Sequence, residues 1–293
     1  MTRIAQFRET LFGWAWQAGV RVFRLSRRVG VAGVLEPVLW KVAARLLPVS
    51  DQETLVRLPS GASLVLPPRY RDARTVSAGL FQPELTRLLS SLLRPGMSAV
   101  DIGAYVGYFT VIAAQAVGAA GRVYCFEPNP SSYVYLRRNI QLNGFQNVVS
   151  AEQAISSQVR TMQLVADPLG PESFVTDLPD PRAAGSVEAV SLDHVFSRLG
   201  WPRIHLIRMN IEGSELAALD GMKQTSQRNP ELQLIMEFNP RAMVRAGVSR
   251  ATLSSLLDDL GFRRSQVIED RLRPISDGVL PAGQAVYNLL LTK

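Results

Sequence analysis

From about residue 98 onward, short runs of apolar residues alternate with longer stretches in which apolar positions recur every three or four residues. The first pattern predicts strands and the second predicts helices. Such alternation is typical of an α/β fold with a doubly wound, mostly parallel sheet. The predicted strands span residues 98–102, 122–126, 147–151, 204–209, 232–237 and 285–291, and the predicted helices span 83–93, 108–116, 131–141 and 214–222.

Residues 1–50 form a second pattern, with apolar side chains such as Phe7, Leu11 and Trp14 on one helical face and arginines largely on the other. A basic helix of this kind is typical of a membrane surface. The same periodicity also suits a helix packed on its own domain or on a partner subunit, so both interpretations stay open. The runs at 54–58 and 63–66 flank a Pro-Ser-Gly turn and predict a β-hairpin. We therefore divide the chain into an N-terminal basic amphipathic helical region with a β-hairpin (1–80) and a larger α/β domain (81–293).

The net charge of +7 lies almost entirely in the first 50 residues, which carry eight cationic and two anionic side chains. The rest of the chain is nearly neutral, so we expect no nucleic-acid partner. The longest uncharged stretch near the N-terminus, 10–20, is about half of the roughly 20 residues that a spanning helix needs, and arginines interrupt any signal-peptide core. We expect a cytoplasmic protein, in peripheral contact with the inner face of the membrane if the basic helix binds lipid.

The cysteine and histidine counts exclude two classes of site. Cys125 is the single cysteine, so neither an intrachain disulfide nor a cysteine-ligated zinc site can form. With only two histidines, we expect no metal. Residues 167–185 are rich in Pro, Gly and Asp and interrupt the alternation, which predicts a long loop that is functional or mobile.

The first strand of the α/β region ends in Asp101-Ile-Gly-Ala-Tyr-Val-Gly107, at the edge where such sheets bind ligands. Gly103 and Gly107 let the backbone approach a ligand. The spacing is not that of the dinucleotide fingerprint, because Asp and Val occupy positions where it requires glycine. Asp101 suits a ligand with a cationic amino group, and the rings of Tyr105 or Tyr108 suit a sulfonium.

The second strand of this region ends at Glu127, where a carboxylate can accept both hydrogens of a ribose diol. Adenosine attached to an amino-acid tail fits these features better than a dinucleotide does. S-adenosylmethionine is such a molecule.

Several motifs, in order, resemble the FkbM family of S-adenosylmethionine-dependent methyltransferases over residues 79–262. The resemblance implies a Rossmann-type class I methyltransferase fold with a last antiparallel strand, and methyl transfer to a hydroxyl of a sugar, glycolipid or polyketide-type natural product. It places the cofactor at Asp101, Gly103, Gly107 and Glu127, and at Gln153 and Ala154 in the turn after the third strand. Tyr105 and Asn129, beside these positions, are further candidate cofactor-binding residues. The motifs are Asp101-x-Gly-Ala-x-x-Gly-Tyr-x-Thr110, Phe126-Glu-Pro-Asn-Pro130, Asn139-x-x-Leu-Asn143, Ser191-Leu-Asp193, Asn210-Ile-Glu-Gly-Ser-Glu-Leu216 and Met236-Glu237.

The sequence departs from the family at Asn210, where the usual pattern reads Asp-x-Glu-Gly. Asparagine cannot act as a general base and is a poorer ligand for a hard cation than a carboxylate is. The candidate catalytic residues are therefore Asn210, Glu212 and Glu237, with the base role moved to a glutamate or with catalysis mainly by positioning. Glu212 equally suits a helix N-terminus, where acids are stabilised whatever their function.

Two hypotheses follow. The first is an O-methyltransferase that acts on a small-molecule or saccharide acceptor. The second is a donor-binding but inactive or regulatory module that has lost the acid at position 210. A nicotinamide-dependent enzyme is disfavoured by Asp101 and Val106. The sequence does not indicate the oligomeric state.

Overall fold

The computed structural model describes residues 50–167, 173–268, 272–275, 280 and 284–293. By their internal contacts the residues group into two units, 1–52 with 68–70, and 53–67 with 71–293. The predicted N-terminal basic helix lies outside the described residues. The α/β core and the site considered below belong entirely to the second unit.

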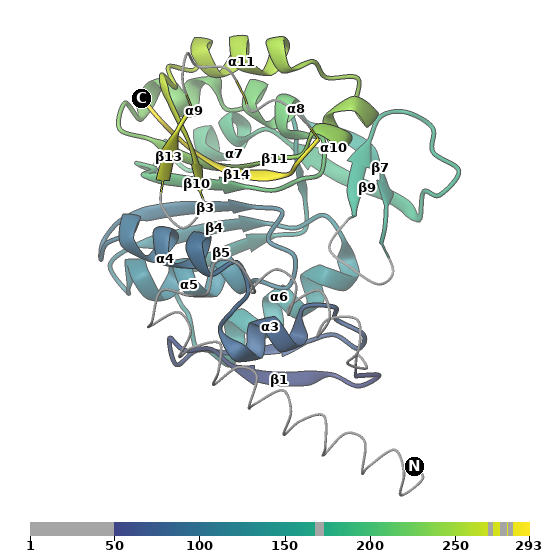
Figure 1. Cartoon of the computed structure of the whole chain (residues 1–293), viewed down its shortest axis with the longest axis vertical. Helices are drawn as coiled ribbons and strands as arrows, with labels where there is room; N and C mark the ends of the chain where they lie inside the picture. Colours follow the sequence, from purple (N-terminus) through teal and green to yellow (C-terminus); the bar gives the residue numbers. More distant parts are fainter. Residues whose placement is uncertain (1–49, 168–172, 269–271, 276–279, 281–283) are drawn as a thin grey trace, which may run out of the picture. The chain divides into compact units, whose positions relative to one another are not determined.

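An eight-stranded sheet forms the centre of the second unit (Figure 1). Five strands are parallel neighbours, and β14 runs antiparallel between β11 and β12. This confirms the predicted Rossmann-type sheet with a last antiparallel strand. From one edge to the other the strands are β5 (Val148–Ala151), β4 (Arg122–Phe126), β3 (Ser98–Ile102), β10 (Leu206–Met209), β11 (Gln233–Phe238), β14 (Tyr287–Thr292), β12 (Arg264–Ile268) and β13 (Leu272–Pro274).

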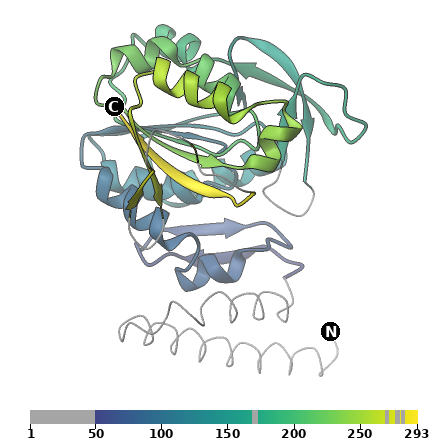
Figure 2. The ribbon, with the colours of Figure 1, turned by 45° about the horizontal axis from the view of Figure 1, so that its top comes forward.

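Helices cover both faces of this sheet (Figures 1 and 2). On one face lie α4 (Pro83–Leu92), α5 (Tyr108–Val117) and α6 (Pro130–Leu142), and on the other lie α7 (Leu192–Arg198), α8 (Glu215–Asp220), α9 (Lys223–Arg228), α10 (Pro240–Arg245) and α11 (Arg250–Asp259). The central strands are buried because apolar side chains occupy both of their faces. None of the helices among the described residues is both long and apolar enough to cross a membrane.

Two helices that start directly after a strand are fixed by an asparagine and a proline. Asn129 caps α6 by accepting from the Ser131 N–H, and Asn239 caps α10 by accepting from the Arg241 and Ala242 N–H groups. In both helices proline takes the first turn, where no backbone donor is needed. The ends of β4 and β11 are therefore held in place by local sequence.

A second sheet is inserted between β5 and β10. Its strands are β6 (Ala154–Ile155), β7 (Arg160–Val165), β8 (Phe174–Thr176) and β9 (Gly185–Val190), in the order β6-β9-β7-β8. The prediction of one long loop over 167–185 is therefore wrong in part, because β8 lies within it. The sequence pattern missed these strands because they are short and depend on pairing with one another and on a small core built around Met162 and Val187.

The predicted hairpin is present as β1 (Thr54–Arg57) and β2 (Ser63–Leu66), which pair antiparallel. It groups with the second unit. Asn139 of α6 accepts from the Val65 N–H at 2.7 Å and donates to the Val65 carbonyl at 3.0 Å, as a neighbouring strand would. The same side chain donates to the carbonyl of Val106 at 2.8 Å. One buried asparagine thus ties the hairpin to the turn after β3. A helix α3 (Ala73–Ala78) follows the hairpin.

Candidate active site

The turn after β3 brings two strand ends into contact. Gly103 has a φ of +75°, a left-handed value that favours glycine, and a Cβ added there would lie 2.0 Å from the backbone oxygen of Asn210. Glycine therefore allows this turn to touch the loop that follows β10. From β3 the chain proceeds to β4 and β5 on one side of the sheet and later to β10 and β11 on the other. Doubly wound folds bind ligands at such a reversal point.

Asp101, at this turn, is buried and held from two sides. Its Oδ2 accepts from Thr110 Oγ1 at 2.6 Å, and its Oδ1 lies 3.2 Å from Nη1 of Arg208 on β10. The same nitrogen donates to the Gly103 carbonyl at 2.9 Å, and the guanidinium lies 4.8 Å from the centre of the Phe109 ring. The cation next to Asp101 is thus one of the protein's own. A contact between Asp101 and a ligand's amino group stays a prediction.

Glu127, at the end of β4, is 5% exposed and accepts two backbone hydrogen bonds. The Tyr105 N–H donates to Oε2 at 2.8 Å and the Asn129 N–H donates to Oε1 at 2.9 Å. Burial raises the pKa of Glu127 to about 7, against the lowering effect of those two N–H groups. The carboxyl group therefore joins the turn after β3 to the start of α6. The Asn129 side chain also reaches the inserted segment, where its amide donates to Ser173 Oγ at 3.2 Å.

The remaining predicted cofactor positions have different surroundings. Tyr105 is partly buried beside Asp72 and Asp167, and burial with these neighbouring charges raises the pKa of its phenol, so the ring stays neutral. Ala154 is buried in β6, within the inserted sheet, and Gln153 next to it donates to Glu188 Oε2 at 2.6 Å. Tyr108 packs edge-on against Phe81 and Phe109.

The three predicted catalytic residues lie together at the carboxyl ends of β10 and β11. Asn210 Nδ2 donates to Glu237 Oε2 at 3.2 Å. The carboxyl groups of Glu237 and Glu212 form a pair close enough for Glu212 to raise the pKa of Glu237. Asn239, the cap of α10, donates to Glu212 Oε2 at 3.1 Å. The structure therefore unites positions that are 27 residues apart in sequence.

Burial and neighbouring charges raise the pKa of two carboxyl groups in this cluster to near neutrality. Burial, together with the charges of Glu212 and Glu215, raises the pKa of Glu237 to about 7, and the nearby charge of Arg208 opposes them. Burial likewise raises the pKa of Glu215 to about 7. Glu215 accepts the N–H groups of Ile211 at 3.3 Å and Gly213 at 2.8 Å, so it shapes the loop that carries Glu212. Glu237 is suited to gain and lose a proton under physiological conditions.

The hydrogen-bonding groups of the site fit an adenosyl amino acid. Each Glu127 oxygen accepts one N–H and has a second lone pair available for a ribose hydroxyl. Asn210 Oδ1 is buried and has no hydrogen-bond partner among the described residues. A buried acceptor left unpaired costs about 1–3 kcal/mol, so a ligand N–H or O–H there is stabilising. No three His, Cys, Asp or Glu side chains in the described part of the chain are placed to hold a metal ion.

Sequence reasoning missed Arg208 and Glu215. A signal for Arg208 was present, because an arginine in the otherwise apolar strand Leu206–Met209 needs a buried partner. Other motif residues have structural roles. Ser191 caps α7, and Asp193 accepts the N–H groups of Gln224 at 2.9 Å and Thr225 at 2.7 Å at the start of α9. Cys125 is buried in β4, and His205 Nδ1 accepts from the Ser98 N–H at the opposite end of β10.

Comparison with known families shows to which family the chain belongs. The family model described as "Methyltransferase FkbM domain" matches residues 101–264, which include both strand-end clusters. The chain belongs to the FkbM methyltransferase family. The matched region is thus a methyltransferase domain, and S-adenosylmethionine is the cofactor that this family indicates.

Curated relatives match this chain either over a short region or, over a longer region, at lower sequence identity. A protein-L-isoaspartate O-methyltransferase of Aeropyrum pernix is 31% identical over 109 residues, which cover 33% of this chain and 40% of the relative. That of Pyrobaculum arsenaticum is 32% identical over 84 residues, 28% of this chain and 38% of the relative. These matches span less than half of either relative. Methyltransferase sdnD of Sordaria araneosa is 26% identical over 194 residues, 56% of this chain and 72% of the relative.

Solved structures with a similar arrangement share little sequence. An S-adenosylmethionine-dependent O-methyltransferase of Thermotoga maritima is 16% identical, with a TM-score of 0.43 over 82% of this chain and 77% of that one. TYW2 of M. jannaschii, solved in complex with AdoMet, is 15% identical, with a TM-score of 0.42 over 84% of this chain and 86% of that one.

Proposed function

We propose that this FkbM-family methyltransferase transfers a methyl group to a hydroxyl oxygen of a small molecule, of the sugar, glycolipid or polyketide type. The observation that supports the proposal is the carboxyl pair of Glu237 and Glu212 beside Asn210. Glu212 lies in the loop after β10, the strand next to β3, and Glu237 lies near the end of β11, one strand further from the turn predicted to hold the donor. A hydroxyl oxygen is a poor nucleophile until its proton is removed, whereas a neutral amine can attack without a base. This pair is a base suited to take the hydroxyl proton as the oxygen bonds to carbon.

When bound, S-adenosylmethionine supplies a methyl group that is already electrophilic. Glu237 then has one task, which is to accept the proton of the acceptor hydroxyl as the carbon–oxygen bond forms and the carbon–sulfur bond breaks. A pKa of about 7 leaves Glu237 ionised in about half of the molecules at neutral pH. Asn210 orients Glu237 by donating to Oε2. General-base catalysis contributes about 10² to 10⁴ in rate, and positioning of the reactants contributes the larger part.

The test is methyl transfer from radiolabelled S-adenosylmethionine to a panel of hydroxylated and amine acceptors. Glu237→Gln should lower kcat by about 10² or more while the Kd for the cofactor stays unchanged. Glu231→Gln is the matched control, because Glu231 is exposed, pairs with Arg203 and lies just before the opposite end of β11. Full activity of the Glu237→Gln variant would refute the base role.

The other two outcomes separate the competing hypotheses. Preferential methylation of amines would refute transfer to oxygen. Cofactor binding without methylation of any acceptor would favour the inactive, donor-binding module.

A further inference from the structure

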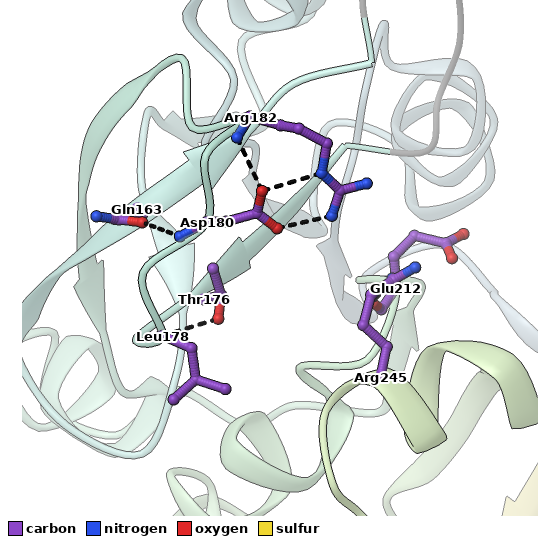
Figure 3. Close-up of polar contacts among 7 residues, drawn as sticks. All are labelled: Gln163, Thr176, Leu178, Asp180, Arg182, Glu212 and Arg245. Atoms are coloured by element: carbon purple, nitrogen blue, oxygen red, sulfur yellow. Dashed lines mark hydrogen bonds and ion pairs between the residues drawn. The ribbon is translucent and has the colours of Figure 1, made fainter.

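A groove of about 980 Å³ opens beside the carboxyl pair. Its lining includes Glu212, Gly213 and Ser214 in the loop that follows β10. One wall comes from the inserted sheet, with Met162 and Val175, and the other comes from α8 and α11, with Leu216 and Leu256. In Figure 3, Thr176, Asp180 and Arg182 lie on the side of the inserted sheet, across from Glu212 and Arg245. Glu212 thus belongs both to the carboxyl pair and to the groove.

The groove is long enough for more than one ring of an acceptor. The residues of α11 that line it are Ala251, Thr252, Ser255, Leu256 and Asp259. They mark one face of the helix over two turns, a length of about 12 Å at about 1.5 Å per residue. The volume lies at the upper end of the roughly 300–1,000 Å³ that is usual for small-molecule sites. A single hydroxylated ring at Glu212 would leave most of this length unfilled.

The charges of the groove disfavour an anionic occupant. Its lining contains two arginines, Arg160 and Arg245, and four acidic residues, Asp177, Glu212, Asp220 and Asp259. Both arginines already have partners, although Nε of Arg160 is buried without a hydrogen-bond partner among the described residues. Arg160 pairs with Asp177 at 2.6 Å, and Arg245 donates to the Glu212 carbonyl at 2.6 Å and lies 4.1 Å from the centre of the Phe174 ring. Asp220 pairs with Lys223 outside the lining, and the three other acidic side chains still outnumber the two arginines by one, which disfavours a phosphate or carboxylate here.

The rest of the lining is apolar or hydroxylated. Aliphatic side chains of both walls face the groove, and the neutral hydroxyls of Ser157, Thr176, Thr252 and Ser255 stand among them. Such a surface buries hydrocarbon and can exchange hydrogen bonds with neutral oxygen atoms. It has the character expected for a neutral amphiphile.

We propose that this groove holds the methyl acceptor, and that the acceptor is an uncharged amphiphile with a hydroxyl-bearing head at Glu212 and a hydrocarbon portion along α11. This inference rests on the proposed function, because it takes Glu212 and Glu237 as the site of methyl transfer. It assigns acceptor selection to the inserted sheet and α11. It disfavours phosphorylated acceptors.

The experiment uses the full chain, saturated with S-adenosylhomocysteine, and measures binding by calorimetry with three probes below their micellar concentrations. The probes are octyl β-D-glucoside, glucose and octyl phosphate. Octyl glucoside should bind at least about tenfold more tightly than either of the others, since each tenfold step corresponds to about 1.4 kcal/mol. Glucose tests the need for hydrocarbon, and octyl phosphate tests the selection against negative charge.

Two tryptophan variants locate the binding. Ala251→Trp places a large ring in the groove from an exposed position of α11 and should weaken octyl glucoside binding at least about tenfold. Val244→Trp is the matched control, because Val244 is 74% exposed on α10 and does not line the groove. Both variants should retain the wild-type Tm and cofactor Kd.

The outcomes separate this inference from the proposed function. Absence of octyl glucoside binding, tighter binding of octyl phosphate, or equal effects of the two variants would overturn the groove assignment, even if hydroxyl acceptors are methylated. Binding that depends on Ala251, without methylation of any acceptor, would leave the groove assignment standing and refute the proposed function.

Discussion

Replacing Asn210 with aspartate adds a third carboxylate to the pair of Glu237 and Glu212, about where the Asn210 amide now donates to Glu237 at 3.2 Å from Oε2. The substitution removes a hydrogen bond that favours the ionised form of Glu237 and adds a like charge that opposes it. Two charges about 4 Å apart repel by about 1 kcal/mol in a water-like dielectric and by about 4 kcal/mol at an effective dielectric of about 20. At about 1.36 kcal/mol per unit, the pKa of Glu237 rises by about one to three units from its value of about 7.

The sign of the effect on rate follows from the base role. Glu237 must be ionised to accept a proton, so the Asn210→Asp variant should lose activity at pH 7. The acid limb of its pH profile for kcat should move upward by about one unit or more. The rate should recover at higher pH. The assay is methyl transfer measured from about pH 6 to 10, with the cofactor Kd determined at each pH.

Gln227→Glu is the control, because Gln227 is exposed on α9 and the substitution adds the same charge away from the site. Its pH profile should match that of the wild type. An acid limb that stays in place or moves downward in Asn210→Asp would refute the assignment of Glu237 as the base.

Three further predictions concern the framework of the site. Gly103→Ala should lower the free energy of unfolding, measured with urea, by at least about 2 kcal/mol more than Gly144→Ala does. Both glycines have a positive φ, but of the two only Gly103 would place its new Cβ against a backbone oxygen, at 2.0 Å. Arg208→Met should lower the Tm by roughly 6–20 °C, because it leaves Asp101 buried without its cation. Such a loss costs about 3–5 kcal/mol, and each kcal/mol corresponds to about 2–4 °C in a domain of this size. An unchanged Tm would show that the pair is not needed for stability. Asn139→Ala should lower the free energy of unfolding by about 2 kcal/mol or more and weaken cofactor binding, because the side chain holds both the hairpin and the turn after β3. A loss of stability with an unchanged cofactor Kd would show that the turn keeps its shape without Asn139.

Much of the fold could be predicted from local sequence. The pattern places the five parallel strands within two residues of their observed bounds, because each is a short, mostly apolar run bounded by polar or helical sequence. The inserted sheet could not be predicted, because β8 spans only Phe174–Thr176 and is stabilised by its pairing with β7. The carboxyl cluster was predicted in part. Glu237 is a candidate because a charge at the end of a buried strand needs a partner, whereas Glu215 resembles an ordinary acid at the start of a helix.

The sequence by itself determined which side chains stand at the ends of the strands, because strand length and helix capping are local properties. Glu127, Glu237 and the turn glycines follow from that local order. The tertiary structure alone decided how these groups are paired, since hydrogen bonds and charges act across space. The register of β10 against β3 sets Arg208 opposite Asp101, and the insertion brings its sheet beside α11 to form the groove. Residues 107 positions apart in the sequence thereby form one buried ion pair.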